Sequence, residues 1–344
     1  MATPADTSVA NVLTHADALV QRGDALAAIE ALTTANRTRR DPAIERALVR
    51  TRYAAFVRGD GRAVPGAPAV DLPAVAGGGG LHTIPPGELT PDALGAGIRG
   101  AGCVHVPGLV DAATAAALVD GIDRAFHALA AHRDGADTNG ELDGWYEPFR
   151  AAPEHKLGIK RKWVVDNGGI WTADSPPMLF ALLEVYRDAG LLDTITAHLG
   201  ERPALSVNKS TLKRIDGATG GEWHQDGAFL GHGIRTVNVW LSLSQCGLDA
   251  PGLDVVPRRI DHVLETGTDG AAFDWAVGPG LVERIAVDDP VVRPEFGPGD
   301  ALLFDELFLH RTAAEPSMPR LRYAIESWFF APAAYPDGLA PLLV

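Results

Sequence analysis

The sequence predicts an α+β protein in which an antiparallel barrel or jelly roll, also called a double-stranded β-helix, is flanked by helices and preceded by a helical extension. Three observations indicate this architecture. Apolar residues recur at helical spacing near the amino terminus, helical patterns dominate residues 88–200, and a series of short strand patterns follows from residue 204. With 344 residues, the chain is long enough for one substantial domain and a smaller appendage.

The first 62 residues form the predicted helical extension. Its helical pattern is interrupted at Gly23 and then resumes, and a third helix is expected at Asp41 and Pro42, which suit a helix cap and a first helical turn. The layout loosely resembles one tetratricopeptide unit, although a plain helical extension explains it equally well. A single unit cannot bury its own apolar face, so we expect it to dock on the rest of the chain.

A segment rich in proline and glycine separates this extension from the main domain. It covers residues 63–87 and is interpreted as a linker or a segment draped over the surface. The main domain is therefore expected over residues 88–344. This segment is the best domain boundary that the sequence offers.

The first half of the main domain is predicted to be mainly helical. A short apolar run at residues 102–109 predicts a strand, and a helix that begins at Asp111 is expected to follow it to residue 129. Residues 131–177 are expected to be irregular and to form a lid or a pocket wall. A further helical pattern covers residues 178–199.

Turn residues divide the rest of the domain into short strands. The expected strands are residues 204–215, 233–246, 253–257, 291–296, 301–310 and 320–331. Such a series after a helical region is typical of an antiparallel barrel or jelly roll. No Gly-x-Gly-x-x-Gly pattern follows a strand, and no Gly-x-x-x-x-Gly-Lys-Ser/Thr pattern is present, so neither nucleotide-binding motif is indicated.

Composition narrows the class of partner. A hydrophobic content of 46% and a charged content of 22% are typical of a globular protein. The net charge of −14 disfavours nucleic acid, and the chain has neither a polybasic run nor an apolar stretch long enough to span a membrane. No secretory signal pattern opens the sequence, so we expect a cytoplasmic protein. Cys103 and Cys246 are interpreted as buried reduced thiols, although two cysteines also permit one disulfide.

The most informative segment, residues 221–227, contains His224 and Asp226. On a strand, side chains two residues apart share a face, so this histidine and this carboxylate would point the same way, and Gln225 would point away. Together with a second, later histidine they would form the facial triad of a non-haem iron site, which leaves three coordination positions open. A His-x-Asp pattern is weak evidence when it stands alone.

His310 is the candidate for the second histidine. It ends the apolar run 301–310, which follows the turn at residues 297–300. A jelly roll brings such a late strand beside an early one. The alternative is that His310 is a polar residue that simply ends a strand. Its order after His224 and Asp226 nevertheless supports the triad.

An arginine near the start of the last, otherwise apolar strand is expected to pair with an anion. Buried arginine usually pairs with a carboxylate, which its planar guanidinium binds through two hydrogen bonds. The distal carboxylate of 2-oxoglutarate is the expected anion, and a salt bridge to an acidic residue of the barrel is the alternative. Arg320 and Arg322 have the same parity on the strand, so spacing alone does not choose between them.

These segments resemble the phytanoyl-CoA dioxygenase family of iron(II)/2-oxoglutarate oxygenases. The matching segments are residues 102–109, 223–227, 237–243, 252–257, 299–304, 310–312 and 322–324. The resemblance spans about residues 88–331 and leaves residues 1–87 uncovered. A His-Gln-Asp-Gly sequence followed in order by the later histidine and arginine is a fairly specific set.

The resemblance implies roles for individual residues. His224, Asp226 and His310 match the iron ligands, and Arg322, rather than Arg320, matches the arginine that binds 2-oxoglutarate. Thr312 lies where the family often has a serine, so a hydroxyl contact to the co-substrate is expected.

Asn238 shares a strand face with Trp240 and is a candidate to hydrogen-bond the substrate or co-substrate, whereas Trp240 is expected to serve packing. The chain also departs from the family at two places. Arg311 replaces a glycine after the second histidine, and residues 257–262 replace a Pro-Gly-Ser-His turn. Both changes concern the rim of the pocket.

The implied activity is that of an iron(II)/2-oxoglutarate-dependent dioxygenase, which uses O2 and hydroxylates or otherwise oxidises a small organic or lipid-like substrate. Related halogenases lack the carboxylate ligand, so the presence of Asp226 favours hydroxylation or a similar oxidation. Two alternatives belong to other classes of protein. One is a jelly-roll protein that binds a metal or ligand without catalysis, and the other is an adaptor that recruits a partner through its amino-terminal helices.

Overall fold

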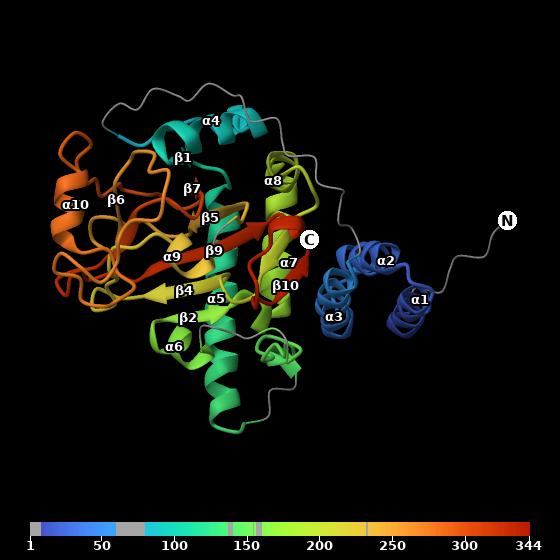
Figure 1. Cartoon of the computed structure of the whole chain (residues 1–344). Helices are drawn as coiled ribbons and strands as arrows, with labels where there is room; N and C mark the ends of the chain where they lie inside the picture. Colours follow the sequence, from blue (N-terminus) through green and yellow to red (C-terminus); the bar gives the residue numbers. More distant parts are fainter. Residues whose placement is uncertain (1–7, 60–79, 137–139, 154, 156–159, 232) are drawn as a thin grey trace.

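A computed structural model describes residues 8–59, 80–136, 140–153, 155, 160–231 and 233–344. The antiparallel strands lie in the middle of the main domain, and helices lie on more than one side of them (Figure 1). The predicted combination of helices and antiparallel sheet is confirmed. Among the described residues, no helix is both long and apolar enough to cross a membrane.

The described part of the amino-terminal extension contains three helices: α1 (Val9–Gln21), α2 (Ala25–Thr38) and α3 (Pro42–Arg58). Each begins at a side chain that accepts a hydrogen bond from the first helical turn, namely Ser8, Asp24 and Asp41. The break at Gly23 has the expected cause, since this residue adopts a φ of 84°, which glycine tolerates without strain. The local signals in the sequence therefore located these helices correctly.

The extension docks on the main domain through α3, which contacts α7 (Pro176–Asp188) and β10 (Pro341–Leu343). The Arg52 guanidinium is buried and donates a 2.7 Å hydrogen bond to the Leu343 carbonyl. Arg46 forms ion pairs with Asp143 and Glu147 in the connection after α5 (Ala112–Arg133). Apolar packing and these polar contacts supply the docking that a single helical unit requires.

The predicted linker, residues 63–87, falls largely outside the described residues. Its described part, from residue 80, lies along the domain, where Thr83 forms an isolated bridge with His105 of β1 (Cys103–Val106). The Ile84 amide also donates to the His105 carbonyl at 3.0 Å. This part of the segment is therefore attached to the edge of the sheet.

Helices and turns of the main domain follow the predicted order with different bounds. They are η1 (Pro86–Glu88), α4 (Pro91–Ala101), α5 (Ala112–Arg133), η2 (Gly140–Leu142), α6 (Arg161–Asp166), η3 (Thr172–Asp174), α7, α8 (Leu191–Leu199), α9 (Gly227–Leu230), α10 (Pro279–Ile285) and η4 (Pro332–Ala334). Asp111 caps α5 as predicted. The region 131–177 is less irregular than expected, because Asp174 accepts hydrogen bonds from the Phe149 amide and from Arg161 and so fixes its course.

Strands in the described part of the chain form an eight-stranded sheet and a two-stranded sheet. In the large sheet the order is β1-β7-β5-β9-β3-β10, with β4 also paired to β9 and β2 paired to β4. The remaining bounds are β2 (Gly169–Trp171), β3 (Ala204–Ser206), β4 (Thr211–Ile215), β5 (Thr236–Ser242), β7 (Ala301–Phe304) and β9 (Arg322–Phe330). The small sheet consists of β6 (Gly252–Val255) and β8 (His310–Ala313).

Two predicted strands are in fact pairs of strands. The run 204–215 is divided by a turn, in which Asn208 and Ser210 accept hydrogen bonds from the Ala340 and Trp328 amides. The run 301–310 is divided where Asp305 accepts from the Leu307 amide. The apolar residue pattern continues across both turns, so the sequence does not indicate them. Residues 291–296 were also predicted as a strand, but they form isolated bridges at Val292 and Phe296.

Each face of the large sheet has its own core. One face packs against the helices through residues such as Val104, Leu303 and Ile325. The opposite face, with Trp240 and Trp328, packs with the small sheet. No strand pairing joins the two sheets within the described residues, so closure into a double-stranded β-helix is not confirmed.

Candidate metal centre

His224 lies beside β8, where it forms a two-way backbone bridge with His310. The His224 amide donates to the His310 carbonyl at 3.0 Å, and the reverse bond measures 3.1 Å. Cross-strand neighbours of this kind have adjacent side chains, and the two imidazole centroids are 4.5 Å apart. The fold thus brings together two histidines that are far apart in the sequence.

Asp226 reaches the same place by a turn rather than by strand alternation. Its φ of −63° and ψ of −25° are helical, and it starts α9, so the predicted extended course of this segment ends at His224. The expectation that alternation on a strand aligns these two ligands is therefore wrong. Gln225 does point away from them, as predicted.

The buried Gln225 side chain explains why the chain turns here. Its amide nitrogen donates to the Leu307 carbonyl at 2.6 Å and to the His262 carbonyl at 3.1 Å, and its amide oxygen accepts from the Leu264 amide at 2.7 Å. The Gly227 amide donates to the Glu306 carbonyl at 2.8 Å. Hydrogen bonds to distant segments of the chain therefore fix both ends of the turn.

The three candidate ligand atoms lie within 4.8 Å of one another. His310 Nε2 and Asp226 Oδ2 are 3.8 Å apart. The Nδ1 atoms of both histidines contact backbone carbonyls, at 2.8 Å for His224 and 3.0 Å for His310. Such a contact fixes the ring and leaves Nε2 to face an ion, as is usual for histidines that bind metals. A divalent metal that prefers nitrogen and oxygen ligands fits this donor set.

Charge states in the cluster also suit a metal. Burial, followed by the neighbouring His224, lowers the pKa of His310 to about 4, so this imidazole is neutral near pH 7. Burial alone would raise the pKa of Asp226, but the attraction of Lys209 and the two histidines outweighs it and lowers that pKa to about 2. A neutral imidazole and an ionised carboxylate are the forms that coordinate metals.

Arg322 lies at the start of β9, on the face of the large sheet that packs with the small sheet. Its side chain is buried, its Nη1 donates to the Gly252 carbonyl at 2.9 Å, and its guanidinium lies 5.6 Å from the centroid of the Trp240 ring. Burial lowers its pKa. Its Nε has no hydrogen-bond partner among the described residues. Arg320, by contrast, is exposed and precedes the strand.

Asn238 and Thr312 face the same interior. Asn238 is fully buried on β5, and both polar atoms of its amide group lack a hydrogen-bond partner in the described structure. Thr312 is two residues after His310 on β8 and therefore shares its face. Gly221 leaves room beside this threonine, since a Cβ at Gly221 would lie 3.2 Å from the Thr312 Cβ. Trp240 packs against Phe296 as predicted, with centroids 4.8 Å apart.

Comparison with known proteins agrees with this geometry. The phytanoyl-CoA dioxygenase (PhyH) family model matches residues 98–318, which is more than half of the chain and contains all three candidate ligands. The chain belongs to the phytanoyl-CoA dioxygenase family. Members of this family are iron(II)/2-oxoglutarate-dependent oxygenases, so the chain is an enzyme of that class, with iron(II), 2-oxoglutarate and O2 as its requirements.

Several solved structures are similar to this member of the phytanoyl-CoA dioxygenase family. EctD from S. alaskensis, in a structure with 2-oxoglutarate and 5-hydroxyectoine, is 18% identical over 70% of this chain and 76% of its own, with a TM-score of 0.48. AviO1 from Streptomyces viridochromogenes Tue57 is 19% identical over 72% and 98%, with a TM-score of 0.44. The carbocyclase SnoK from nogalamycin biosynthesis is 15% identical over 68% and 81%, with a TM-score of 0.43. No curated protein sequence matches the chain.

Lys209 is a site residue that the sequence analysis missed. It precedes β4 and forms an ion pair with Asp226 Oδ1 in which both side chains are largely buried. Its Nζ also lies 5.4 Å from the Phe229 ring centroid and 5.7 Å from that of Trp328. Nothing in the local pattern distinguishes this lysine, because only the tertiary fold brings it to the ligand.

The two departures from the phytanoyl-CoA dioxygenase pattern have structural roles. Arg311 donates two hydrogen bonds to Asp254 and lies 5.0 Å from the Trp223 ring centroid, so it points away from the metal ligands. In the altered turn, Arg259 pairs with Asp305 and Asp261. These arginines are therefore held by partners of their own.

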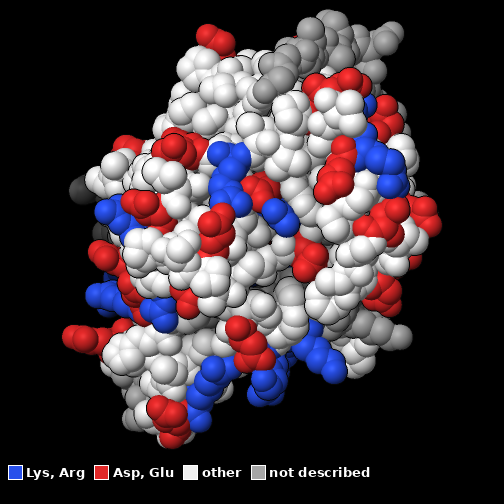
Figure 2. All heavy atoms as spheres, turned by 90° about the vertical axis from the view of Figure 1, so that its left-hand side faces the viewer, with Lys and Arg blue, Asp and Glu red and all other residues white. Residues whose placement is uncertain are grey.

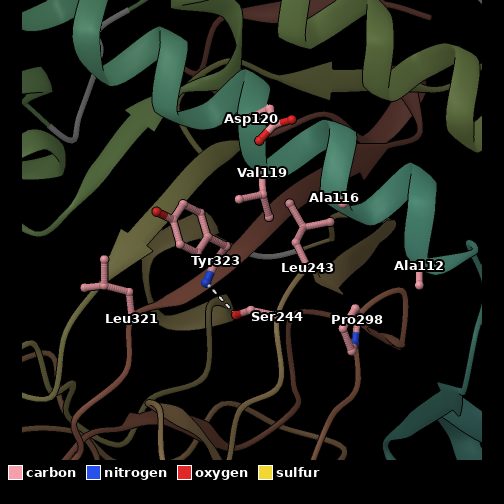
Figure 3. A pocket seen from close by; sticks show the side chains of 9 residues that line it. All are labelled: Ala112, Ala116, Val119, Asp120, Leu243, Ser244, Pro298, Leu321 and Tyr323. Atoms are coloured by element: carbon pink, nitrogen blue, oxygen red, sulfur yellow. Dashed lines mark hydrogen bonds between the residues drawn. The ribbon is translucent and has the colours of Figure 1, made fainter.

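Two surface hollows lie apart from the candidate ligands. One, of about 380 Å³, lies between α5 and the ends of β5 and β9, and Figure 3 shows Leu243, Leu321 and Tyr323 in its wall. The other, of about 420 Å³, is lined by Trp223 and residues of α10. Neither hollow is lined by His224, Asp226 or His310. On the side of the molecule seen in Figure 2, acidic and basic side chains are interspersed, so this face offers no continuous basic surface to a nucleic acid.

Proposed function

We propose that this dioxygenase hydroxylates, or otherwise oxidises, a small organic substrate at a metal centre formed by His224, Asp226 and His310. The co-substrate site consists of Arg322, Thr312 and Asn238 in this proposal. Residues 88–344 act as the catalytic domain, with strands arranged as an incompletely closed jelly roll, and residues 1–62 brace it.

The observation that carries the proposal is the set of buried polar atoms that lack partners beside the ligand cluster. Buried polar groups are nearly always hydrogen-bonded, and each exception requires an explanation. Arg322 Nε and both amide atoms of Asn238 are such exceptions among the described residues. A dianionic 2-oxo acid supplies acceptors for the guanidinium and for the Asn238 amino group, and a free carboxylate there would satisfy a cation that is costly to bury alone.

The same observation weighs against a metal-binding protein without catalysis. A structural metal site needs no buried arginine with an unpaired Nε in the adjacent interior, because such a group only destabilises the fold. Three protein ligands also leave coordination positions for other molecules, as catalytic sites do. The chain therefore retains features that cost stability unless a second anionic ligand binds.

The protein residues contribute positioning and charge. The two imidazoles are fixed by the carbonyls of Glu222 and Phe308, so their Nε2 atoms need little reorganisation. Arg322 would orient the co-substrate through its distal carboxylate. When bound, iron(II), 2-oxoglutarate and O2 supply the oxidising chemistry, with succinate and carbon dioxide as co-products. The apolar interior around Trp240 and Phe304 excludes water from this reaction.

An anaerobic titration of the metal-free protein with iron(II) and then 2-oxoglutarate tests the proposal. Formation of a bidentate 2-oxoglutarate complex produces a weak charge-transfer band in the visible range. We expect this band in the wild type, its loss in His310→Ala, and a weaker affinity for 2-oxoglutarate in Arg322→Ala. Arg320→Ala is the matched control and should behave as wild type. A folded wild-type protein that binds iron but gives no band would refute the proposed function.

A further inference from the structure

Three cationic side chains lie in the interior beside the candidate metal centre. Burial, together with the nearby Arg322 and Lys209, lowers the pKa of Lys213, and the carboxyl groups of the same region are those of Asp226, Glu326 and Glu306. Asp226 is both a candidate metal ligand and the ion-pair partner of Lys209. A metal bound there would draw on the carboxylate that neutralises Lys209, and a cation without its full partner is costly in a low-dielectric environment.

Pairing among these groups identifies Lys209 as the cation whose carboxylate partner a metal would share. Lys213 and Glu326 are diagonal neighbours on the same face of β4 and β9, and Glu326 also accepts a hydrogen bond from Thr211 at 3.0 Å. In the proposed site, Arg322 binds the co-substrate. Asp226 presents Oδ2 toward His310 Nε2 and Oδ1 toward Lys209, so a metal and Lys209 would share a single carboxylate charge.

Lys209 is held in place by its surroundings rather than being a mobile surface group. Its neighbour Asn208 accepts a hydrogen bond from the Ala340 amide at 2.9 Å, and Ser210 on the other side accepts from the Trp328 amide at 3.2 Å. The ammonium lies near two aromatic rings, those of Phe229 and Trp328. The site is therefore preorganised for an anion that approaches the metal.

An aromatic surface adjoins this ammonium. The rings of Phe229 and Trp275 have centroids 5.5 Å apart, and both lie within 6.3 Å of the His224 ring centroid. Phe273 stacks on Trp275 at 5.3 Å. Phe229 and Phe273 are about half exposed, at 47% and 53%, so the cluster is accessible to a small molecule.

We infer that the substrate of this enzyme is a small carboxylate whose anionic group pairs with Lys209 and whose apolar or aromatic body lies against Phe229 and Trp275. The inference rests on the proposed function, because it takes the metal and co-substrate sites as given. It narrows the substrate class to carboxylates with an apolar or aromatic body. A substrate carboxylate on Lys209 would compensate this ammonium for the Asp226 charge that a metal draws on, and would hold the adjacent carbon atoms next to the metal ligands.

Binding of probe molecules to the anaerobic iron(II)–2-oxoglutarate complex tests this inference without turnover. The probes are phenylacetate and hexanoate, each with its neutral amide, phenylacetamide and hexanamide. Binding is followed by the shift of the charge-transfer band and by tryptophan fluorescence. A charge-assisted contact of about 1.5–3 kcal/mol corresponds to a preference of about 10–100-fold for the acid. We expect this preference in the wild type, its loss in Lys209→Met, and its retention in Lys209→Arg.

Lys162→Met is the matched control, since it removes a lysine that is 82% exposed on α6. It should keep the preference for the acids. Equal binding of acids and amides to the wild type would overturn the inference, as would a loss of 2-oxoglutarate affinity in Lys209→Met that exceeds the loss for the probes, because Lys209 would then serve the co-substrate. Absence of the charge-transfer band itself would instead refute the proposed function, so the two failures are distinguishable.

Discussion

Replacing Gln225 by alanine tests whether the hydrogen bonds of this side chain stabilise the turn that carries the metal ligands. The change removes the three hydrogen bonds of this buried side chain. At a net contribution of about 0.5–1.5 kcal/mol for each bond, the expected loss in the free energy of unfolding is about 1.5–4.5 kcal/mol. For a domain of this size each kcal/mol lowers the melting temperature by about 2–4 °C, so we expect a decrease of roughly 3–18 °C.

The same substitution should also weaken metal binding. Gln225 lies between His224 and Asp226, so a looser turn misaligns two of the three ligands, and an iron(II) affinity reduced at least about 10-fold is expected. Circular dichroism on heating and an anaerobic iron titration measure the two effects. Gln21→Ala, an exposed change at the end of α1, is the control. A Gln225→Ala protein with wild-type stability and iron affinity would refute the reasoning.

Three single substitutions give further predictions. Asn238→Leu should raise the stability of the metal-free protein by about 1–3 kcal/mol, because it removes unpaired polar atoms, and should weaken 2-oxoglutarate binding at least about 10-fold. Denaturant titration measures the stability, and the charge-transfer band measures the affinity. A gain in 2-oxoglutarate affinity would contradict the co-substrate role. Burial, followed by repulsion from Asp305, raises the pKa of Glu306 from 4.5 to about 7, so this group holds its proton more tightly when folded and destabilises the fold as pH rises from 5 to 8. Glu306→Gln should therefore gain about 1–3 kcal/mol over wild type at pH 8 and little at pH 5, and an equal difference at both values would exclude this cause. Leu48→Ala, at a fully buried position of α3, should lower the free energy of unfolding by about 2–5 kcal/mol in thermal or denaturant unfolding. Val57→Ala, at an exposed position of the same helix, should lower it by less than about 0.5 kcal/mol. Similar losses for both would show that α3 does not pack as described.

Features that depend on neighbouring residues in the sequence were predictable. The caps at Asp41 and Asp111 were recognised because capping involves residues within one helical turn. The breaks within residues 204–215 and 301–310 were not recognised, since their hydrogen bonds come from Ala340 and Trp328 or lie within an apolar run.

The candidate site likewise combines features that the sequence predicted with features that depend on distant residues. His224, Asp226 and His310 were found from residue type and order, and the structure brings their ligand atoms together. The stated reason, alternation on one strand, was wrong for Asp226, because the Gln225 contacts come from residues 37–82 positions away in the chain. Lys209 was missed for a similar reason, since its partner is fixed by tertiary structure rather than by a spacing.

The acidic chain and its cationic interior should have opposite effects on an anionic co-substrate. With a net charge of −14, the molecule repels dianionic 2-oxoglutarate at long range, whereas Arg322, Lys209 and Lys213 attract it at short range inside the fold. Raising the ionic strength from about 0.01 M to 0.15 M shortens the screening length from about 30 Å to about 8 Å, which suppresses the distant repulsion more than the buried attraction. Stopped-flow mixing of 2-oxoglutarate with the anaerobic iron(II) protein should therefore show faster association at the higher salt concentration, with dissociation nearly unchanged. Slower association would mean that the positive interior, rather than the acidic exterior, governs the approach of the anion.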